Sequence, residues 1–286
     1  MAVHLPATVD EAIDHLAAAP SSTVLAGGTD LMVEVNDGHR RPSEVIVVNR
    51  IPELRSWRHD PRSATVTIGA AVTYREMLDG PLATLVPALS QAARTVGSPQ
   101  IRNAGTLGGN LGTSSPAGDG LPVLSALGAE VEIASAAGRR RLPVGEFMIG
   151  VKRTALAPGE LIVSVTVPVV DGWQGYAKVG VRNAMVIAVA SVCVVLDRSQ
   201  RQVGVALGSV GPTILRCGAA EEHLAAALDW STLSAADAEL DRFAELVSAA
   251  SRPITDHRSS AEYRRHAVGV LARRLVRRAS NPEVAA

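Results

Sequence analysis

The first 170 residues alternate between short strand-like runs and stretches with apolar residues at helical spacing. Thr8–Glu11 has the S/T-x-x-E form of a capping box and predicts the start of a helix. Its apolar face would carry Val9, Ala12, Ile13 and Leu16. Alternating or β-branched runs predict strands at Thr23–Ala26, Glu44–Asn49, Thr65–Gly69 and Leu161–Val167, and a hairpin joining Val131–Ile133 to Arg139–Leu142. Further helices are expected at Asp30–Val35, Leu82–Val96 and Leu121–Leu127.

The rest of the chain separates its strands from its helices. Asp171–Gly175 is expected to be a boundary loop. Strand-like runs then follow at Tyr176–Arg182, Val186–Leu196 and Gln202–Ser209. Helical patterns come after them, at Ala219–Leu228, Asp237–Ala250 and Ser260–Arg278, and Ser234 is the expected N-cap of the second helix. This order predicts an α+β domain over 171–286, in which a three-stranded antiparallel sheet packs on three helices. Residues 1–170 would form a separate domain, with subdomains at about 1–53 and 54–170.

Composition excludes several classes of protein. Lys+Arg and Asp+Glu both total 28, so charge gives no reason to expect nucleic acid as a partner. The two cysteines, Cys193 and Cys217, form no metal-binding spacing, so we expect no zinc or iron–sulfur cluster on this chain. No apolar run is long enough to span a membrane. The first residues also lack the features of a signal peptide, so a cytoplasmic location is expected.

Two glycine pairs carry the strongest chemical signal. They lie in Leu25–Leu31 (LAGGTDL) and Gly105–Asn110 (GTLGGN), and Ser115–Asp119 (SPAGD) follows the second. Adjacent glycines can take positive φ and expose consecutive N–H groups, which then bind an anion. One such pair usually makes only a turn, but two in one domain suit a pyrophosphate. The chain has no GxGxxG, P-loop, GxSxG or HExxH motif, which argues against Rossmann, nucleotidase and hydrolase interpretations.

Arginine is concentrated near the C-terminus, where the segment 252–278 holds eight arginines against Asp256 and Glu262. A solvated helix face is the preferred interpretation of this charge, and a docking surface for an acidic partner is the alternative. Lysine is scarce by contrast, because Lys152 and Lys178 are the only two in the chain.

The motifs together resemble the FAD-binding medium subunits of molybdenum hydroxylases, the family of carbon monoxide dehydrogenase and xanthine dehydrogenase. Ala26–Leu31 is similar to the first flavin motif of that family, and Ile101–Asn110 with Ser115–Asp119 is similar to the second. Further segments follow in the family order, at Gly159–Pro168, Tyr176–Val179 with Arg182, Ala206–Thr213 and Ala261–Arg265. The resemblance covers nearly the whole chain.

The resemblance implies a fold in which two α/β subdomains clasp FAD and a small α+β domain follows. Both glycine loops would hold the pyrophosphate, with Asp119 on the ribose or phosphate side. Leu161 and Ile162 would contact the adenine, and Lys178 would lie beside the flavin ring. The implied cofactor-binding residues are Leu25, Ala26, Gly27, Gly28, Thr29, Asp30, Thr106, Gly108, Gly109, Asn110, Ser115, Asp119, Leu161, Ile162 and Lys178. No catalytic residue and no metal ligand are expected.

Val96 and Asn183–Ala188 depart from the family pattern, because some relatives place an aromatic residue or acidic residues there. The flavin would then be more open here or covered by a partner. By resemblance, the chain would pass electrons from the iron–sulfur clusters of a small subunit to an external acceptor. Substrate oxidation would take place on a large molybdopterin-binding subunit. The alternatives are a stand-alone flavin oxidoreductase acting on a small molecule, and a nucleotide-binding protein without redox function.

Overall fold

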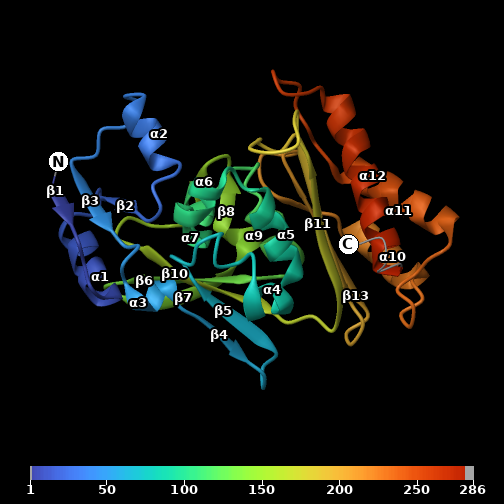
Figure 1. The fold of residues 1–286 in the computed structure, drawn as a ribbon, viewed down its shortest axis with the longest axis horizontal. Helices are drawn as coiled ribbons and strands as arrows, with labels where there is room; N and C mark the ends of the chain where they lie inside the picture. The colour runs from blue at the N-terminus through green and yellow to red at the C-terminus, as the bar shows by residue number, and fades with distance from the viewer. Residues whose placement is uncertain (1, 281–286) are drawn as a thin grey trace.

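The computed structural model describes residues 2–280, and three groups of strands and helices follow one another across the molecule (Figure 1). The first group holds a parallel sheet in the order β1-β3-β2, made of β1 (Ala2–His4), β2 (Thr23–Leu25) and β3 (Glu44–Val47). Helix α1 (Val9–Ala18) begins at the capping box, where Glu11 N donates to Thr8 Oγ1 at 3.1 Å. Strand β2 leads into the first glycine pair, and α2 (Leu31–Asn36) follows it.

The second group is a five-stranded antiparallel sheet with helices on one face. Its order is β4-β5-β10-β6-β7, from β4 (Trp57–Asp60), β5 (Thr65–Gly69), β6 (Glu130–Ser135), β7 (Gly138–Pro143) and β10 (Leu161–Pro168). The main helices are α4 (Gly80–Leu85), α5 (Pro87–Thr95), α6 (Pro99–Ala104), α7 (Leu107–Thr113) and α8 (Gly120–Ala126). The remaining elements are α3 (Pro52–Arg55), α9 (Val144–Phe147), β8 (Met148–Gly150) and β9 (Arg153–Thr154).

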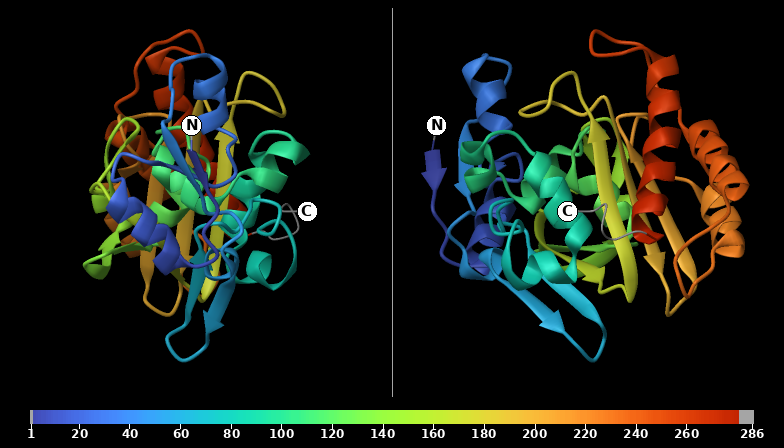
Figure 2. Two further views of the ribbon diagram at one scale, coloured as in Figure 1. Left: turned by 90° about the vertical axis from the view of Figure 1, so that its left-hand side faces the viewer. Right: turned by 45° about the vertical axis from the view of Figure 1, so that its right-hand side comes forward.

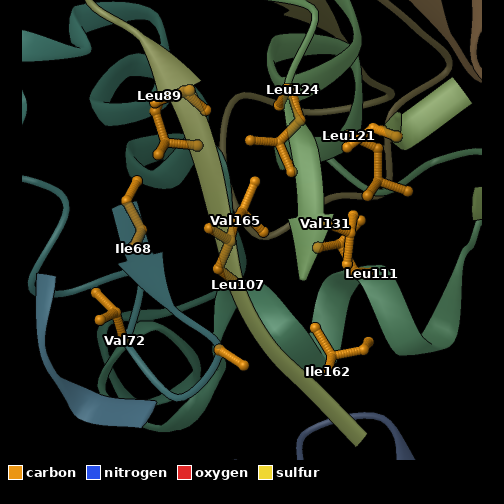
Figure 3. Close-up of a cluster of buried hydrophobic side chains, with 14 of the residues drawn as sticks. Ile68, Val72, Leu89, Leu107, Leu111, Leu121, Leu124, Val131, Ile162 and Val165 are labelled. Atoms are coloured by element: carbon orange, nitrogen blue, oxygen red, sulfur yellow. The ribbon is translucent and has the colours of Figure 1, made fainter. Parts of the chain in front are cut away.

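An aliphatic core joins this sheet to its helices. Figure 3 shows Leu107 and Leu111 of α7 lying against Val131, Ile162 and Val165 of the sheet. These side chains are 7% exposed or less, so α7 is held rigidly on the sheet. The second glycine motif therefore sits on a fixed platform.

The expected helix over Leu82–Val96 is two helices, because Pro87 interrupts the hydrogen-bond ladder and begins α5. Their junction is Val86, which is fully buried although its φ and ψ are not helical. The helical spacing of apolar residues continues through both helices, and Pro87 divides them.

The third group is an antiparallel sheet in the order β11-β12-β13-β14, made of β11 (Gly172–Val179), β12 (Ala190–Asp197), β13 (Gln202–Gly208) and β14 (Leu215–Arg216). The expected sheet had three strands; the fourth is the two-residue β14, which pairs with Ala206 and Leu207. Strand β11 also begins at Gly172, inside the segment expected to be a loop, because the pairing with β12 extends to Asp197.

Helices cover both faces of this third sheet. The three helices expected after the strands are present: α10 (Gly218–Ala227), α11 (Asp237–Ala250) and α12 (Ala261–Ser280). They pack on one face of the sheet (Figures 1 and 2). Helix α11 is preceded by Ala236 rather than by the expected N-cap Ser234. The opposite face contacts α5 and α8 of the second group, so the two sheets share these helices.

Several of the C-terminal arginines form ion pairs within the chain. Arg273 of α12 pairs with Asp241 of α11 at 2.7 Å, and Arg264 pairs with Asp256 at 2.6 Å while donating to the Ser209 carbonyl. These ion pairs link α12 to its neighbours, so part of the arginine cluster at the C-terminus has a structural role within the chain. Among residues 2–280, no helix combines the length and the apolar character needed to cross a bilayer.

Candidate functional site

A cleft of about 770 Å³ lies between the first and second groups of elements. A volume of this order is typical of ligand and cofactor sites. The first glycine loop and α2 form one wall, α7 with the 115–119 segment forms another, and β10 adds an apolar strip. Every residue that the sequence analysis assigned to the cofactor lines this cleft, with the single exception of Lys178. Residues more than 130 positions apart thus meet in one site.

The first glycine loop presents free amide groups to the cleft. Gly28 takes the expected positive φ of 72°. Within the described part of the chain, the N–H groups of Gly27, Gly28 and Thr29 donate to no protein acceptor. Gly27 also has to be glycine, because a Cβ there would overlap the carbonyl oxygen of Ala104. This loop therefore has the free donors that the expected anion site requires.

The second glycine pair is built differently from the expected nest. Gly108 and Gly109 lie inside α7 and have no positive φ. Their amides are already used, since Gly108 N donates to Ala70 O at 2.8 Å and Gly109 N to the N-cap Thr106 Oγ1 at 3.0 Å. Gly108 is required for close packing, because a Cβ there would lie 2.6 Å from the Cβ of Ala70.

What α7 offers instead is a bare helical face. Gly109 and Gly112 lie one turn apart, both line the cleft, and both are exposed. A Cβ on Gly112 would have its nearest neighbour, Ile162 Cδ1, at 3.7 Å, so side chains there would extend into the open cleft. The absence of side chains lets a ligand approach the helix backbone closely.

Polar groups connect and extend these two walls. Thr113 Oγ1 donates to Asp30 Oδ2 at 3.0 Å, which joins α7 to the start of α2. Asn110 lines the cleft, and its Oδ1 is a buried acceptor without a partner among the described residues. Burying such an acceptor is unfavourable unless a ligand or water satisfies it. Leu161 and Ile162 of β10 also line the cleft, and both side chains are buried and apolar, which is compatible with the adenine contact expected of them.

Asp119 is the most strongly constrained charged group in the cleft wall. Its carboxylate accepts from Tyr176 Oη at 2.7 Å and from Lys178 Nζ at 2.8 Å. Burial raises the pKa of Asp119, and the bonds from Lys178 and Tyr176 oppose that shift. Lys178 Nζ also donates to the carbonyls of Thr95 at 2.9 Å and Val186 at 3.1 Å. Lys178 therefore lies behind Asp119, and the carboxylate stands between the ammonium group and the cleft.

Sequence reasoning missed several residues of the cleft. Tyr74 lines it, and burial raises the pKa of its hydroxyl well above the usual value. Arg40 and Lys152 are the cations of the lining, and Lys152 pairs with Glu34 at 2.9 Å. Only Lys152 gave a signal in the sequence, because lysine is so scarce. The others stand in segments without a recognisable motif.

Known proteins with the same construction identify the family. Residues 1–170 match the family described as the FAD binding domain in molybdopterin dehydrogenase, and residues 176–279 match the CO dehydrogenase flavoprotein C-terminal domain. The chain belongs to this family of FAD-binding subunits. Its cofactor is FAD, and it is a flavoprotein oxidoreductase subunit of the molybdenum hydroxylase type.

Individual relatives agree with this assignment over almost the whole chain. The carbon monoxide dehydrogenase medium chain of Hydrogenophaga pseudoflava is 31% identical over 96% of this chain and 94% of its own length. The nicotinate dehydrogenase FAD-subunit of Eubacterium barkeri is 36% identical over 64% of each chain. The solved carbon monoxide dehydrogenase of Hydrogenophaga pseudoflava superposes with a TM-score of 0.87 at 30% identity, covering 98% of this chain and 96% of that one.

The cleft has the features that FAD requires. The free amides of the first loop suit phosphate oxygens. The glycine face of α7 lets the cofactor approach the helix closely, and the apolar strip of β10 suits a base. The unpaired Asn110 Oδ1 offers an acceptor for a ligand hydroxyl or N–H. The residues therefore fit the group that the family binds.

Proposed function

We propose that this chain receives electrons from an iron–sulfur subunit and delivers them, through its FAD, to an external acceptor. A third, large subunit would bind molybdopterin and oxidise the substrate. The observation that carries the proposal is the cleft itself, in which free amides at Gly27–Thr29 face a bare helical surface at Gly109 and Gly112. Bound FAD supplies the redox chemistry, and the residues of this chain bind it, orient it and control its surroundings.

Exposed apolar side chains around the cleft support a partner at its mouth. They come from α2, α6 and the loops after β8 and β11, and they are Met32, Val33, Ile101, Val151, Met185 and Ile187. We call this set the apolar rim. Ile101, Met185 and Ile187 line the cleft directly, and Val151 precedes Lys152, which also lines it. Apolar groups that gather around a binding site indicate a protein contact more often than a free surface.

The substrate of the whole assembly would not be recognised by this chain. Relatives of similar construction are subunits of a carbon monoxide dehydrogenase and of a nicotinate dehydrogenase, two enzymes with chemically unlike substrates. A shared flavin subunit combined with different substrates agrees with a substrate pocket on another chain.

Affinity purification of the tagged chain from its native host tests the proposal. We expect two further chains to co-purify, one with iron–sulfur absorbance and one with molybdopterin, and heat should release FAD from the tagged chain. A single polypeptide that oxidises a small metabolite rapidly by itself would instead support a stand-alone flavin oxidoreductase.

Substitutions in the apolar rim locate the contact. Ile187→Glu is expected to reduce co-purification of the iron–sulfur chain, because Ile187 is 52% exposed at the cleft mouth. Ile254→Glu is the matched control, since Ile254 is 69% exposed in the segment before α12 and does not line the cleft. Equal co-purification of both variants would refute the rim as the contact surface.

A further inference from the structure

The charges of the cleft wall do not favour a pyrophosphate. Four carboxylates line it against two cations: the acids are Asp30, Glu34, Asp119 and Glu160, and the cations are Arg40 and Lys152. Two of the acids are already paired with cations that do not line the cleft, Asp119 with Lys178 and Glu160 with Arg140 through two hydrogen bonds. Asp30 and Glu34 remain, next to the first glycine loop where the phosphates would bind. A cation in this region is needed to offset their repulsion of the cofactor.

Lys152 is placed to provide that cation. It lies on the turn between β8 and β9 in the left-handed conformation, with φ of 51°, and its backbone N–H donates to Ser114 O at 3.1 Å. The turn therefore fixes its Cα against the end of α7. Its ammonium group donates to Glu34 Oε1 at 2.9 Å, and Asp30 is close enough to contribute to the raised pKa of Lys152. Asp30 directly follows the free amides of Gly27–Thr29.

The present partner of Lys152 is one that a phosphate can displace. The Lys152 and Glu34 side chains are 52% and 34% exposed, and ion pairs at such sites contribute little to stability. A lysine ammonium is a compact, mobile donor on a flexible stem and binds phosphate as a point charge. Arg40 is committed elsewhere by comparison, since it donates to Thr23 Oγ1 at 3.3 Å and lies 3.9 Å from Glu34.

We infer that Lys152 is a ligand of the FAD pyrophosphate and leaves Glu34 to bind it. This inference deepens the FAD-binding function proposed above and rests on it. It gives Glu34 a defined role as the competitor that holds the ammonium group at the cleft before the cofactor arrives. It also separates the two lysines, because Lys178 supports the wall while Lys152 faces the ligand.

The test is titration of the deflavinated chain with FAD, followed by flavin fluorescence. Lys152→Met is expected to weaken FAD binding at least tenfold without changing the circular dichroism spectrum, because the side chain is half exposed. Lys152→Arg keeps the charge and should retain most of the affinity. Arg242→Met is the matched control, since Arg242 forms a comparably exposed ion pair with Glu245 on α11. Riboflavin, which has no phosphates, should bind the wild type and Lys152→Met equally.

Glu34→Gln decides between a ligand and a simple clamp. If Lys152 exchanges Glu34 for phosphate, Glu34→Gln should tighten FAD binding several-fold, and this gain should shrink in a Lys152→Met background. If the pair only clamps α2 to the β8–β9 turn, both single variants should weaken FAD binding equally, and the inference is wrong. Unchanged affinity in Lys152→Met would also overturn it. Failure of the wild-type chain to bind FAD would instead refute the function on which the inference rests.

Discussion

Lys178→Met should destabilise the chain through the carboxylate that it leaves behind. Lys178 Nζ lies 2.8 Å from Asp119 Oδ2, and the two side chains are only 7% and 10% exposed. With an effective dielectric constant of about 20, that separation gives a gross attraction of roughly 6 kcal/mol. Removing one partner of a buried pair costs about 3–5 kcal/mol, because the remaining charge is stranded away from water. The carbonyls of Thr95 and Val186 would also lose their donor.

Urea denaturation of the FAD-free chain, followed by circular dichroism, measures this loss. The midpoint concentration should fall while the dependence on urea stays the same. The double variant Lys178→Met/Asp119→Asn is the decisive comparison. It removes the stranded charge and leaves an amide oxygen that can still accept from Tyr176, so it should be more stable than Lys178→Met alone. A loss below about 1 kcal/mol in the single variant, or no recovery in the double variant, would refute the assigned arrangement.

Three further outcomes are expected. Gly112→Leu should abolish FAD retention, because the leucine side chain would extend into the cleft. It should keep or raise the stability of the chain, because leucine favours the helix more than glycine does. Full flavin occupancy in this variant would contradict the role given to the exposed glycines of α7. Gly27→Ala should cost about 1–3 kcal/mol in urea denaturation, since its Cβ overlaps backbone, whereas Gly145→Ala, with open space around it, should not. Arg140 lowers the pKa of Glu160 below its usual 4.5. The ionised carboxylate therefore stabilises the folded state above pH 4.5, and this stability is lost as the pH falls through the lowered pKa. In an acid titration, Glu160→Gln should lose less free energy of unfolding than the wild type.

Local pattern predicted the elements well where each one is determined by its own residues. The capping box before α1 and the alternation in β5 were sufficient, because burial of one face fixes the period. Strand β10 was also predicted, although most of its residues are buried on both faces. Strand β14 escaped detection since two residues carry no period, and it exists only because β13 offers an edge.

The sequence predicted residues that the fold brings to one cleft, but it did not predict which of their backbone groups are free to bind. The second glycine motif lines the cleft, yet two of its amides donate to Ala70 and Val72, two residues about 35 positions earlier that no local pattern connects to it. The position of Lys178 behind Asp119 is likewise a long-range result, since 59 residues separate them. A sequence motif can indicate which residues come together in the site. Which acceptor each N–H group or ammonium group bonds to depends on residues that are distant in the sequence.

The contact between Asp119 and its supports has a consequence for how such chains can be recombined. Asp119 belongs to the segment that matches one domain family, while Tyr176 and Lys178 belong to the segment that matches the other. A chimaera joined between residues 170 and 176 would therefore pair the carboxylate of one parent with the hydroxyl and ammonium groups of another. Exchange of the C-terminal segment would succeed only between parents that have inherited compatible partners on both sides of the junction.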